Sequence, residues 1–160
     1  MVGRSTIVAL RVLLVVIMLG GLVGQLWFFP TLAGELARAY PDLEWLAGTL
    51  LAVVVLVILG AQVALVALWR LLSMVERDSV FSPDAFGWVD VIIIAAIVDT
   101  VLVLGIWALL TFGANANPPA LMLTELALVV SGAALALLMV VMKGLLRKAS
   151  LLRVELSGVV

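Results

Sequence analysis

Four stretches of the sequence are apolar over about 20 residues or more, and this feature limits the possible fold more than any other. They run over residues 7–29, 45–69, 88–112 and 119–142. A helix of that length crosses the hydrocarbon layer of a bilayer, where the backbone finds hydrogen-bond partners only within a helix or a closed barrel. The sequence therefore predicts an all-α integral membrane protein, with residues 1–160 forming a single membrane domain built as a four-helix bundle.

The composition narrows the possible chemistry. The chain is 66% hydrophobic and 12% charged and contains no cysteine and no histidine. Thiolate zinc sites, iron–sulfur clusters and histidine-ligated haem lack their ligands, and a serine nucleophile lacks its usual base. Asp90 and Asp99 lie half a turn out of phase on one predicted helix, so they cannot share a proton as in an aspartyl protease. We expect no enzyme activity, no metal and no cofactor.

The basic residues predict an orientation. Short loops rich in lysine and arginine stay in the cytoplasm. All but one of these residues fall near the two termini or in the predicted loop 70–87, namely Arg4, Arg11, Arg70, Arg77, Lys143, Arg147, Lys148 and Arg153. Only Arg38 falls on the other side. Both termini and the loop 70–87 are therefore expected in the cytoplasm, whereas "PTLAGELARAYPDLEWL" and "GANANPP" are expected outside.

Polar residues within the loop 70–87 resemble the start of a helix. Ser82 precedes Pro83 and Asp84 in the stretch "FSPDAF". A serine accepts from a free backbone N–H, proline suits the first helical position, and a carboxylate favours the positive end of the helix dipole. Ser82 and Asp84 are thus predicted to cap the third span.

The tail, residues 143–160, carries an amphipathic pattern. Leu145, Ala149, Leu152 and Leu156 recur at helical spacing, with Arg147 and Arg153 mostly off that face. An amphipathic helix that extends from the fourth span is expected here. It would lie on lipid, pack on the cytoplasmic loop, or bind a partner protein through these residues.

Placing ionisable and amide side chains in the hydrocarbon layer costs free energy, so each such residue within a span calls for a structural or functional explanation. The candidates are Asp99, Glu125, Gln62 and Asp90. One interpretation is a proton or cation path through Asp99 with Glu125 as an outer relay. The other is structural, with Asp99 hydrogen-bonded to Gln62 or a backbone carbonyl, and Asp90 paired with Arg11 or Arg70.

Small residues mark the predicted helix contacts. Gly132 and Ala136 share the face of Glu125 on the fourth span, and Gly20 with Gly24 forms a small-residue pair on the first. Such residues let helix backbones approach closely in membranes.

Three stretches carry a family resemblance: "VFSPDAFGWVDVI", "ELARAYPDLEWL" and "VVMKGLLRKASLLRVEL". Together they resemble the small four-helix bacterial membrane proteins of domain-of-unknown-function family 2975. The resemblance implies a multi-pass protein of the bacterial cytoplasmic membrane with no established activity. It also implies a frequent genomic association with small helix-turn-helix regulators, which is not evidence of chemistry.

Two functions remain open. The leading hypothesis is a regulatory or accessory membrane protein that binds a protein partner, either a small helix-turn-helix regulator or a larger membrane complex, through its cytoplasmic loop and tail. It would contact the lipid bilayer and no nucleic acid directly. The alternative is transport of protons, cations or small solutes through the intramembrane carboxylates, for which four helices enclose so little volume that a homo-oligomer is expected.

Overall fold

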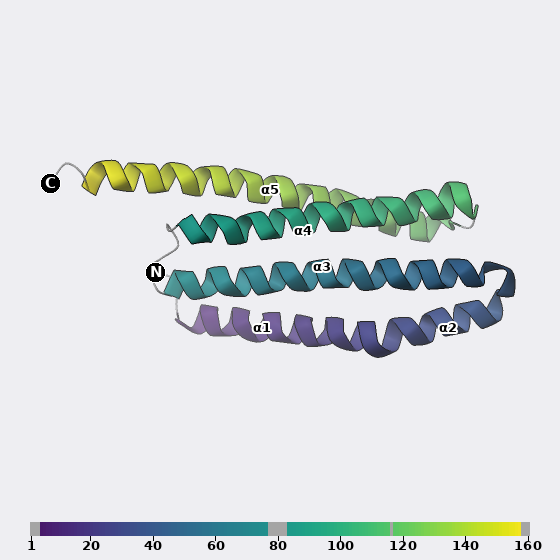
Figure 1. Cartoon of the computed structure of the whole chain (residues 1–160). Helices are drawn as coiled ribbons and strands as arrows, with labels where there is room; N and C mark the ends of the chain where they lie inside the picture. The colour runs from purple at the N-terminus through teal and green to yellow at the C-terminus, as the bar shows by residue number, and fades with distance from the viewer. Residues whose placement is uncertain (1–3, 77–82, 116, 158–160) are drawn as a thin grey trace.

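The computed structural model describes residues 4–76, 83–115 and 117–157, and these are almost entirely helical (Figure 1). The elements follow the chain in the order α1 (Arg4–Val23), a π-helical turn η1 (Gly24–Phe28), α2 (Phe29–Ala39), a 3-10 turn η2 (Pro41–Leu43), α3 (Glu44–Glu76), α4 (Pro83–Ala108), a second π-helical turn η3 (Leu109–Gly113) and α5 (Pro119–Ser157).

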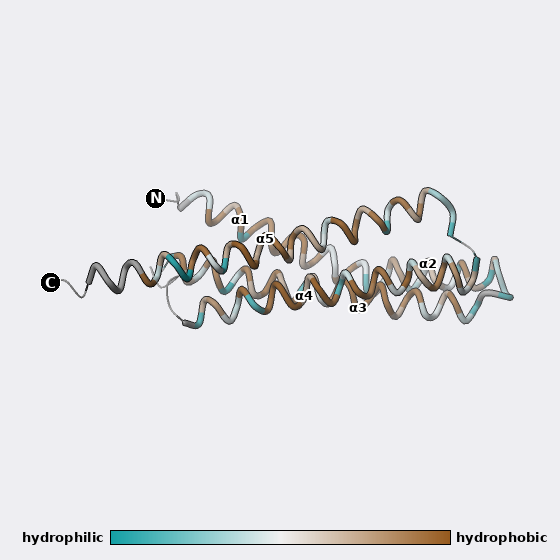
Figure 2. The backbone as a smooth tube through the Cα atoms, turned by 90° about the horizontal axis from the view of Figure 1, so that it is seen from above, coloured by the Kyte–Doolittle hydropathy of each residue, from teal (hydrophilic) through white to brown (hydrophobic). Residues whose placement is uncertain are grey.

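Four helical segments are long and apolar enough to cross a membrane, which confirms the predicted all-α membrane protein. They span Ser5–Ala39, Glu44–Glu76, Asp84–Gly113 and Pro119–Leu151. Figure 2 shows hydrophobic residues dominating the length of these helices. The start of α1, the end of α3 and the start of α4 lie at one end of the molecule, here called the N-terminal end, and α5 projects beyond them (Figure 1).

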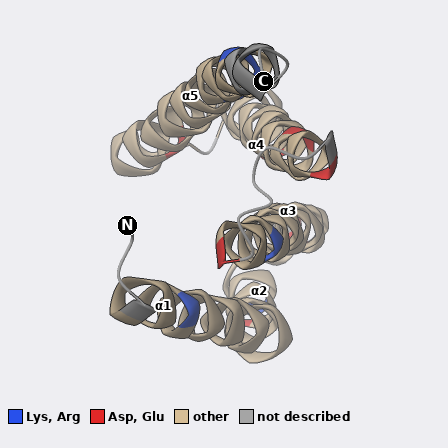
Figure 3. Ribbon diagram, turned by 90° about the vertical axis from the view of Figure 1, so that its left-hand side faces the viewer, with Lys and Arg blue, Asp and Glu red and all other residues tan. Residues whose placement is uncertain are grey.

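The helices form an open arc rather than the closed bundle that the sequence predicts. Extensive contacts join α1 and α2 to α3, α3 to α4, and α4 to α5, and within the described ranges no comparable contact joins α1 or α2 to α5. Viewed from the N-terminal end, α1 and α5 stand apart at the two ends of the arc (Figure 3). Lipid tails are as apolar as leucine, so a membrane helix need not cover its apolar face with protein.

The most buried helix is α4, because it packs against α3 on one side and α5 on the other. Its buried residues are small or β-branched, and they include Ala85, Val89, Ile92, Ala96 and Val103. Large apolar side chains on α1 and α5 are instead exposed, as expected for surfaces that face lipid.

The predicted outward segment between the first two spans is helical. Because Pro30 has no backbone N–H, a regular α-helical turn is interrupted there. The chain takes the wider turn η1, in which the N–H of Phe29 bonds to the carbonyl of Gly24, and continues as α2 to Ala39. The first membrane-spanning segment is therefore longer than 7–29.

The predicted loop 70–87 is shorter in the structure than expected. Because α3 continues to Glu76 and α4 begins at Pro83, residues 70–76 and 83–87 are helical. Asp84 lies exposed in the first turn of α4, where a carboxylate favours the helix dipole. Ser82, the predicted cap, lies outside the described residues. At the other end of the chain, residues 143–157 continue α5 without a break.

Candidate functional site

Asp99 lies near the middle of α4 and packs directly against Gly60 of α3. A Cβ atom built on Gly60 would overlap the carboxylate of Asp99. The Oδ1 atom of Asp99 is buried and has no hydrogen-bond partner in the structure. The predicted hydrogen bond between Asp99 and Gln62 is not formed in the structure, where Nε2 of Gln62 is bonded to Gln25 instead.

Gln62 bonds to Gln25, a residue that the sequence analysis missed. The Nε2 atom of Gln62 donates to Oε1 of Gln25 (3.2 Å), and Nε2 of Gln25 donates to the carbonyl of Val55 (3.2 Å). Gln25 lies in the π-helical turn η1 and is only 9% exposed. Its isolation within an apolar stretch was the same signal that identified Gln62.

Gly21, not Gly20 or Gly24, makes the first span's close contact with α3. A Cβ on Gly21 would lie 3.0 Å from Nε2 of Gln62, whereas a Cβ on Gly20 would meet nothing within 4 Å. A Cβ on Gly24 would contact only Phe29 of the same segment. The predicted pair of Gly20 and Gly24 is therefore wrong, because a Cβ on neither residue would meet α3.

The small-residue face of α5 lies where the sequence predicts it. Gly132 packs against the hydroxyl of Thr100 on α4, and Ala136 is buried. The Oγ1 atom of Thr100 donates to the carbonyl of Ala96 (2.6 Å), so its polar group is satisfied within α4. This face joins α5 to α4.

Glu125 is the most buried charged residue described, with 4% of its surface exposed. Its Oε2 atom accepts a hydrogen bond from Nδ2 of Asn117 (2.9 Å), which also donates to Oγ1 of Thr111 (3.0 Å). The Oδ1 atom of Asn117 is buried without a partner in the structure. Asn117 therefore anchors the start of α5 to the end of the third span.

Asp99 and Glu125 lie at different depths. Gly132 of α5 packs against Thr100, the residue next to Asp99, and therefore marks the depth of Asp99 on α5. Glu125 is two helical turns, about 10 Å, away from Gly132. On α4 the residues between these levels include the apolar Val103 and Ile106. Among the described side chains, no hydrogen bond links the two carboxylates.

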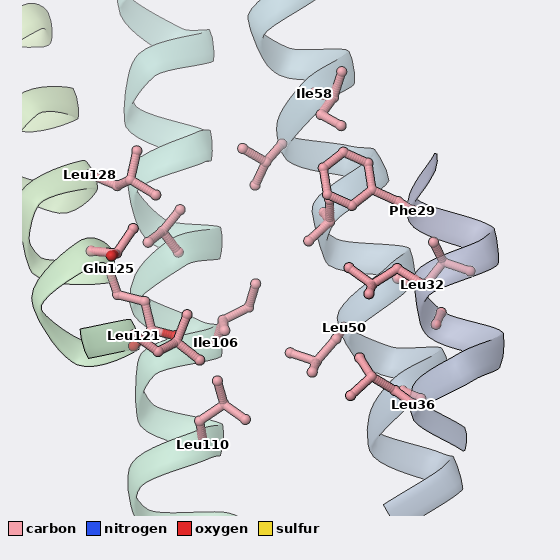
Figure 4. A pocket seen from close by; sticks show the side chains of 17 residues that line it. Phe29, Leu32, Leu36, Leu50, Ile58, Ile106, Leu110, Leu121, Glu125 and Leu128 are labelled. Carbon is pink, nitrogen blue, oxygen red and sulfur yellow. The ribbon is translucent and has the colours of Figure 1, made fainter. Parts of the chain in front are cut away.

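An apolar groove of about 580 Å³ separates the α2–α3 side of the arc from the α4–α5 side. In Figure 4 side chains such as Phe29, Leu32 and Leu50 lie on one wall, and Ile106, Leu121 and Leu128 lie on the other. Glu125 belongs to the α5 wall of this groove.

At the N-terminal end, charged and aromatic contacts join α1 to α3 and α3 to α4. Arg11 of α1 forms an ion pair with Glu76 of α3 (2.5 Å) and lies 5.4 Å from the ring centre of Trp69. Arg70 of α3 lies 5.7 Å from the ring centre of Trp88 on α4. Both arginines are thus engaged on the α3 side of the arc.

Asp90 makes the third such contact, and its partner differs from the prediction. Its Oδ1 atom lies 2.5 Å from Nζ of Lys143 on α5. Asp90 is more than half a helical turn from Trp88, which faces α3, so it faces α5 instead of Arg11 or Arg70. Every pair of neighbouring spans is therefore joined by at least one contact of this kind.

The C-terminal end of α5 projects beyond the other helices (Figure 1). Leu145 is 57% exposed and Leu151 is 59% exposed. Arg147, Lys148 and Ala149 are exposed as well. The side chains of the other predicted partner-binding residues, Leu152, Arg153 and Leu156, lie outside the described residues.

The described residues offer apolar surfaces, side-chain amides and single carboxylates. Within residues 4–76, 83–115 and 117–157, no three acidic side chains gather where they could hold a metal ion. A family model described as "Protein of unknown function (DUF2975)" matches residues 31–160 of the chain. No curated protein and no solved structure matches it.

Proposed function

The chain belongs to the DUF2975 family of proteins of unknown function, and we propose that it is a non-enzymatic membrane subunit that binds a protein partner through the projecting end of α5, residues 144–157. This end continues about 21 Å past Lys143, whereas α4 begins only about 10 Å before Asp90, the partner of Lys143. Among the described residues, the last turns of the projecting end therefore have no neighbouring span. That projection is the observation on which the proposal rests.

The position of Lys143 supports a location of the projecting end of α5 outside the hydrocarbon layer. From Pro119 to Lys143, α5 rises about 36 Å, slightly more than the roughly 30 Å of hydrocarbon in a bilayer. The residues that follow combine exposed leucines with Arg147 and Lys148. A suitable partner has an apolar groove for a helix, flanked by acidic side chains. The family resemblance favours a small helix-turn-helix regulator as that partner, and a larger membrane complex is the alternative.

The proposal includes an orientation, in which the N-terminal end and the projecting end of α5 are cytoplasmic in a bacterial inner membrane. The supporting observation is the concentration of lysine and arginine at that end. Because the chain has no cysteine, single cysteines report orientation without background. In intact cells, Asn115→Cys is expected to react with an impermeant maleimide, whereas Ser150→Cys is expected to react only after lysis. The reverse pattern would contradict the proposal.

A photo-cross-linking amino acid at Lys148, followed by mass spectrometry, tests the partner interaction. One protein is expected to be cross-linked at this position, and Leu145→Asp is expected to lower its yield at least about tenfold, the cost of placing a charge in an apolar interface. Ser150→Asp, on another face of the same helix, is the matched control. If removal of residues 145–160 leaves the associated proteins unchanged, the proposal fails.

Passage of protons or other cations is a second candidate, favoured by the buried and unpartnered Oδ1 atom of Asp99. In the described part of the chain, apolar residues separate Asp99 from the depth of Glu125, which argues against a continuous path within one copy. Ion flux into proteoliposomes decides between the two. Transport predicts a flux that Asp99→Asn abolishes, and a flux equal to that of empty liposomes removes this candidate.

A further inference from the structure

The groove between the α2–α3 and α4–α5 sides of the arc has the size and lining of a small-molecule site. Its volume of about 580 Å³ falls within the roughly 300–1,000 Å³ of ligand pockets, which are mostly apolar with a few placed polar groups. Among its described lining residues only Thr124 and Glu125 are polar. Thr124 donates its hydroxyl hydrogen to the carbonyl of Ala120. Glu125 is thus the one ionisable group of the groove wall.

Glu125 has a donor but, among the described side chains, no cation. Its carboxylate accepts one hydrogen bond from the amide of Asn117, and the ion pairs of the described residues involve other carboxylates, those of Glu76 and Asp90. Buried carboxylates in proteins are ordinarily paired with a cation. Beside Glu125, the amide that donates to it carries a buried oxygen, Oδ1 of Asn117, with no partner in the structure.

We propose that this groove binds a lipophilic molecule that carries a protonated amine. Its hydrocarbon part lies against the leucine, isoleucine and phenylalanine side chains of the two walls, and its ammonium group lies at Glu125. An ammonium group donates up to three hydrogen bonds, and the carboxylate of Glu125 on the groove wall accepts them. The site is at the opposite end of the spans from the projecting end of α5, so this proposal does not depend on the partner interaction.

The charge of Glu125 distinguishes this occupant from other apolar ones. A lipid tail or a helix of a second copy matches the apolar walls but leaves the carboxylate without a cation. A fatty acid places a second negative charge beside the first, which is unfavourable at low dielectric constant. Only a cationic amphiphile satisfies the walls and the carboxylate together.

Native mass spectrometry of the full chain in detergent tests the proposal with dodecylamine and 1-dodecanol. At about pH 7 the amine is protonated, whereas the alcohol is neutral and of equal length. The unaltered chain is expected to bind the amine at least about tenfold more tightly than the alcohol, as for a hydrogen bond to a charged group. In Glu125→Gln, which keeps an acceptor for Asn117, the two are expected to bind equally.

Two further variants locate the site. Leu50→Trp, which fills the groove, is expected to weaken the binding of both probes at least about tenfold. Glu44→Gln removes an exposed carboxylate near the same end of the spans and is expected to keep the full preference for the amine. Leu145→Asp, at the projecting end of α5, is likewise expected to keep it, so the failure of this proposal and of the partner interaction are separable.

Three results would overturn the proposal. One is equal binding of dodecylamine and 1-dodecanol by the unaltered chain, or a preference that survives in Glu125→Gln. Another is unchanged binding of both probes by Leu50→Trp, which would place them in the surrounding detergent. The third is efficient disulfide formation between two copies of Leu50→Cys in native membranes, which would show that a second copy fills the groove.

Discussion

The carboxylate of Asp99 on α4 occupies the space that a side chain at position 60 of α3 would need, so Gly60 and Asp99 together set the separation of the two central helices. Glycine is the only residue at position 60 that leaves this space free. The contact explains how a carboxylate is accommodated in the middle of an apolar span, with its Oδ1 atom enclosed between helices instead of facing lipid.

Gly60→Ala is expected to lower the free energy of unfolding in mixed micelles by about 1–3 kcal/mol, the usual cost of overpacking. Gly48→Ala, on the same helix with nothing within 4 Å, is the control. It is expected to be neutral or to stabilise by up to about 1 kcal/mol, because alanine restricts the unfolded chain more than glycine does. In an Asp99→Ala background the cost of Gly60→Ala should disappear, and a cost that persists there would show that another contact is responsible.

Gln25→Leu is expected to destabilise the protein by about 1 kcal/mol, since hydrogen bonds between membrane helices contribute roughly 0.6–1.7 kcal/mol. The variant leaves Nε2 of Gln62 without its acceptor. Thr49→Val, which removes a hydroxyl bonded within α3 itself, is the control and should change stability less. The double variant Gln25→Leu with Gln62→Leu should regain part of the loss, because no amide is then left unpaired. Thermal unfolding in detergent measures all three.

Asn117→Ala removes the described donor to Glu125 and is expected to cost about 1–3 kcal/mol, the penalty for leaving a buried acceptor unsatisfied. The same substitution in a Glu125→Leu background should cost markedly less, because the acceptor is absent. Equal costs in the two backgrounds would show that Asn117 stabilises the turn before α5 by another route, such as its bond to Thr111. A double-mutant cycle of unfolding free energies separates these cases.

Lys143→Asp places a second carboxylate beside Asp90 and is expected to destabilise the α4–α5 contact by about 0.5 kcal/mol, since both side chains are partly exposed. Exchanging the two residues, as Asp90→Lys with Lys143→Asp, should restore most of the loss at low ionic strength. The effect should shrink as salt is raised, because exposed charges are screened. A salt-independent effect would indicate a packing change instead of an ion pair.

The sequence was sufficient to locate the polar residues that matter but not their partners. Gln62, Asp99 and Glu125 were conspicuous because each stands alone in an apolar stretch, and Asn117 was not, because it lies in a short polar turn where asparagine is common. Gln62 bonds to Gln25 and not to Asp99, since the choice depends on the rotation of each helix about its axis. An apolar pattern on nearly all sides of a helix does not specify that rotation.

What the sequence alone determined is the number of membrane-spanning helices and their approximate places, because lipid offers the backbone no hydrogen-bond partners and each long apolar stretch must form its own. The tertiary structure decided the open arc, the continuation of the first span beyond Pro30, and the pairing of Asp90 with Lys143. These depend on which faces meet, and in lipid the contacts are set by close fits such as Gly21 with Gln62 and Gly60 with Asp99, not by the burial of apolar surface. A difference of one position along a helix turns a residue by about 100°, so such fits became visible only when the helices were placed together.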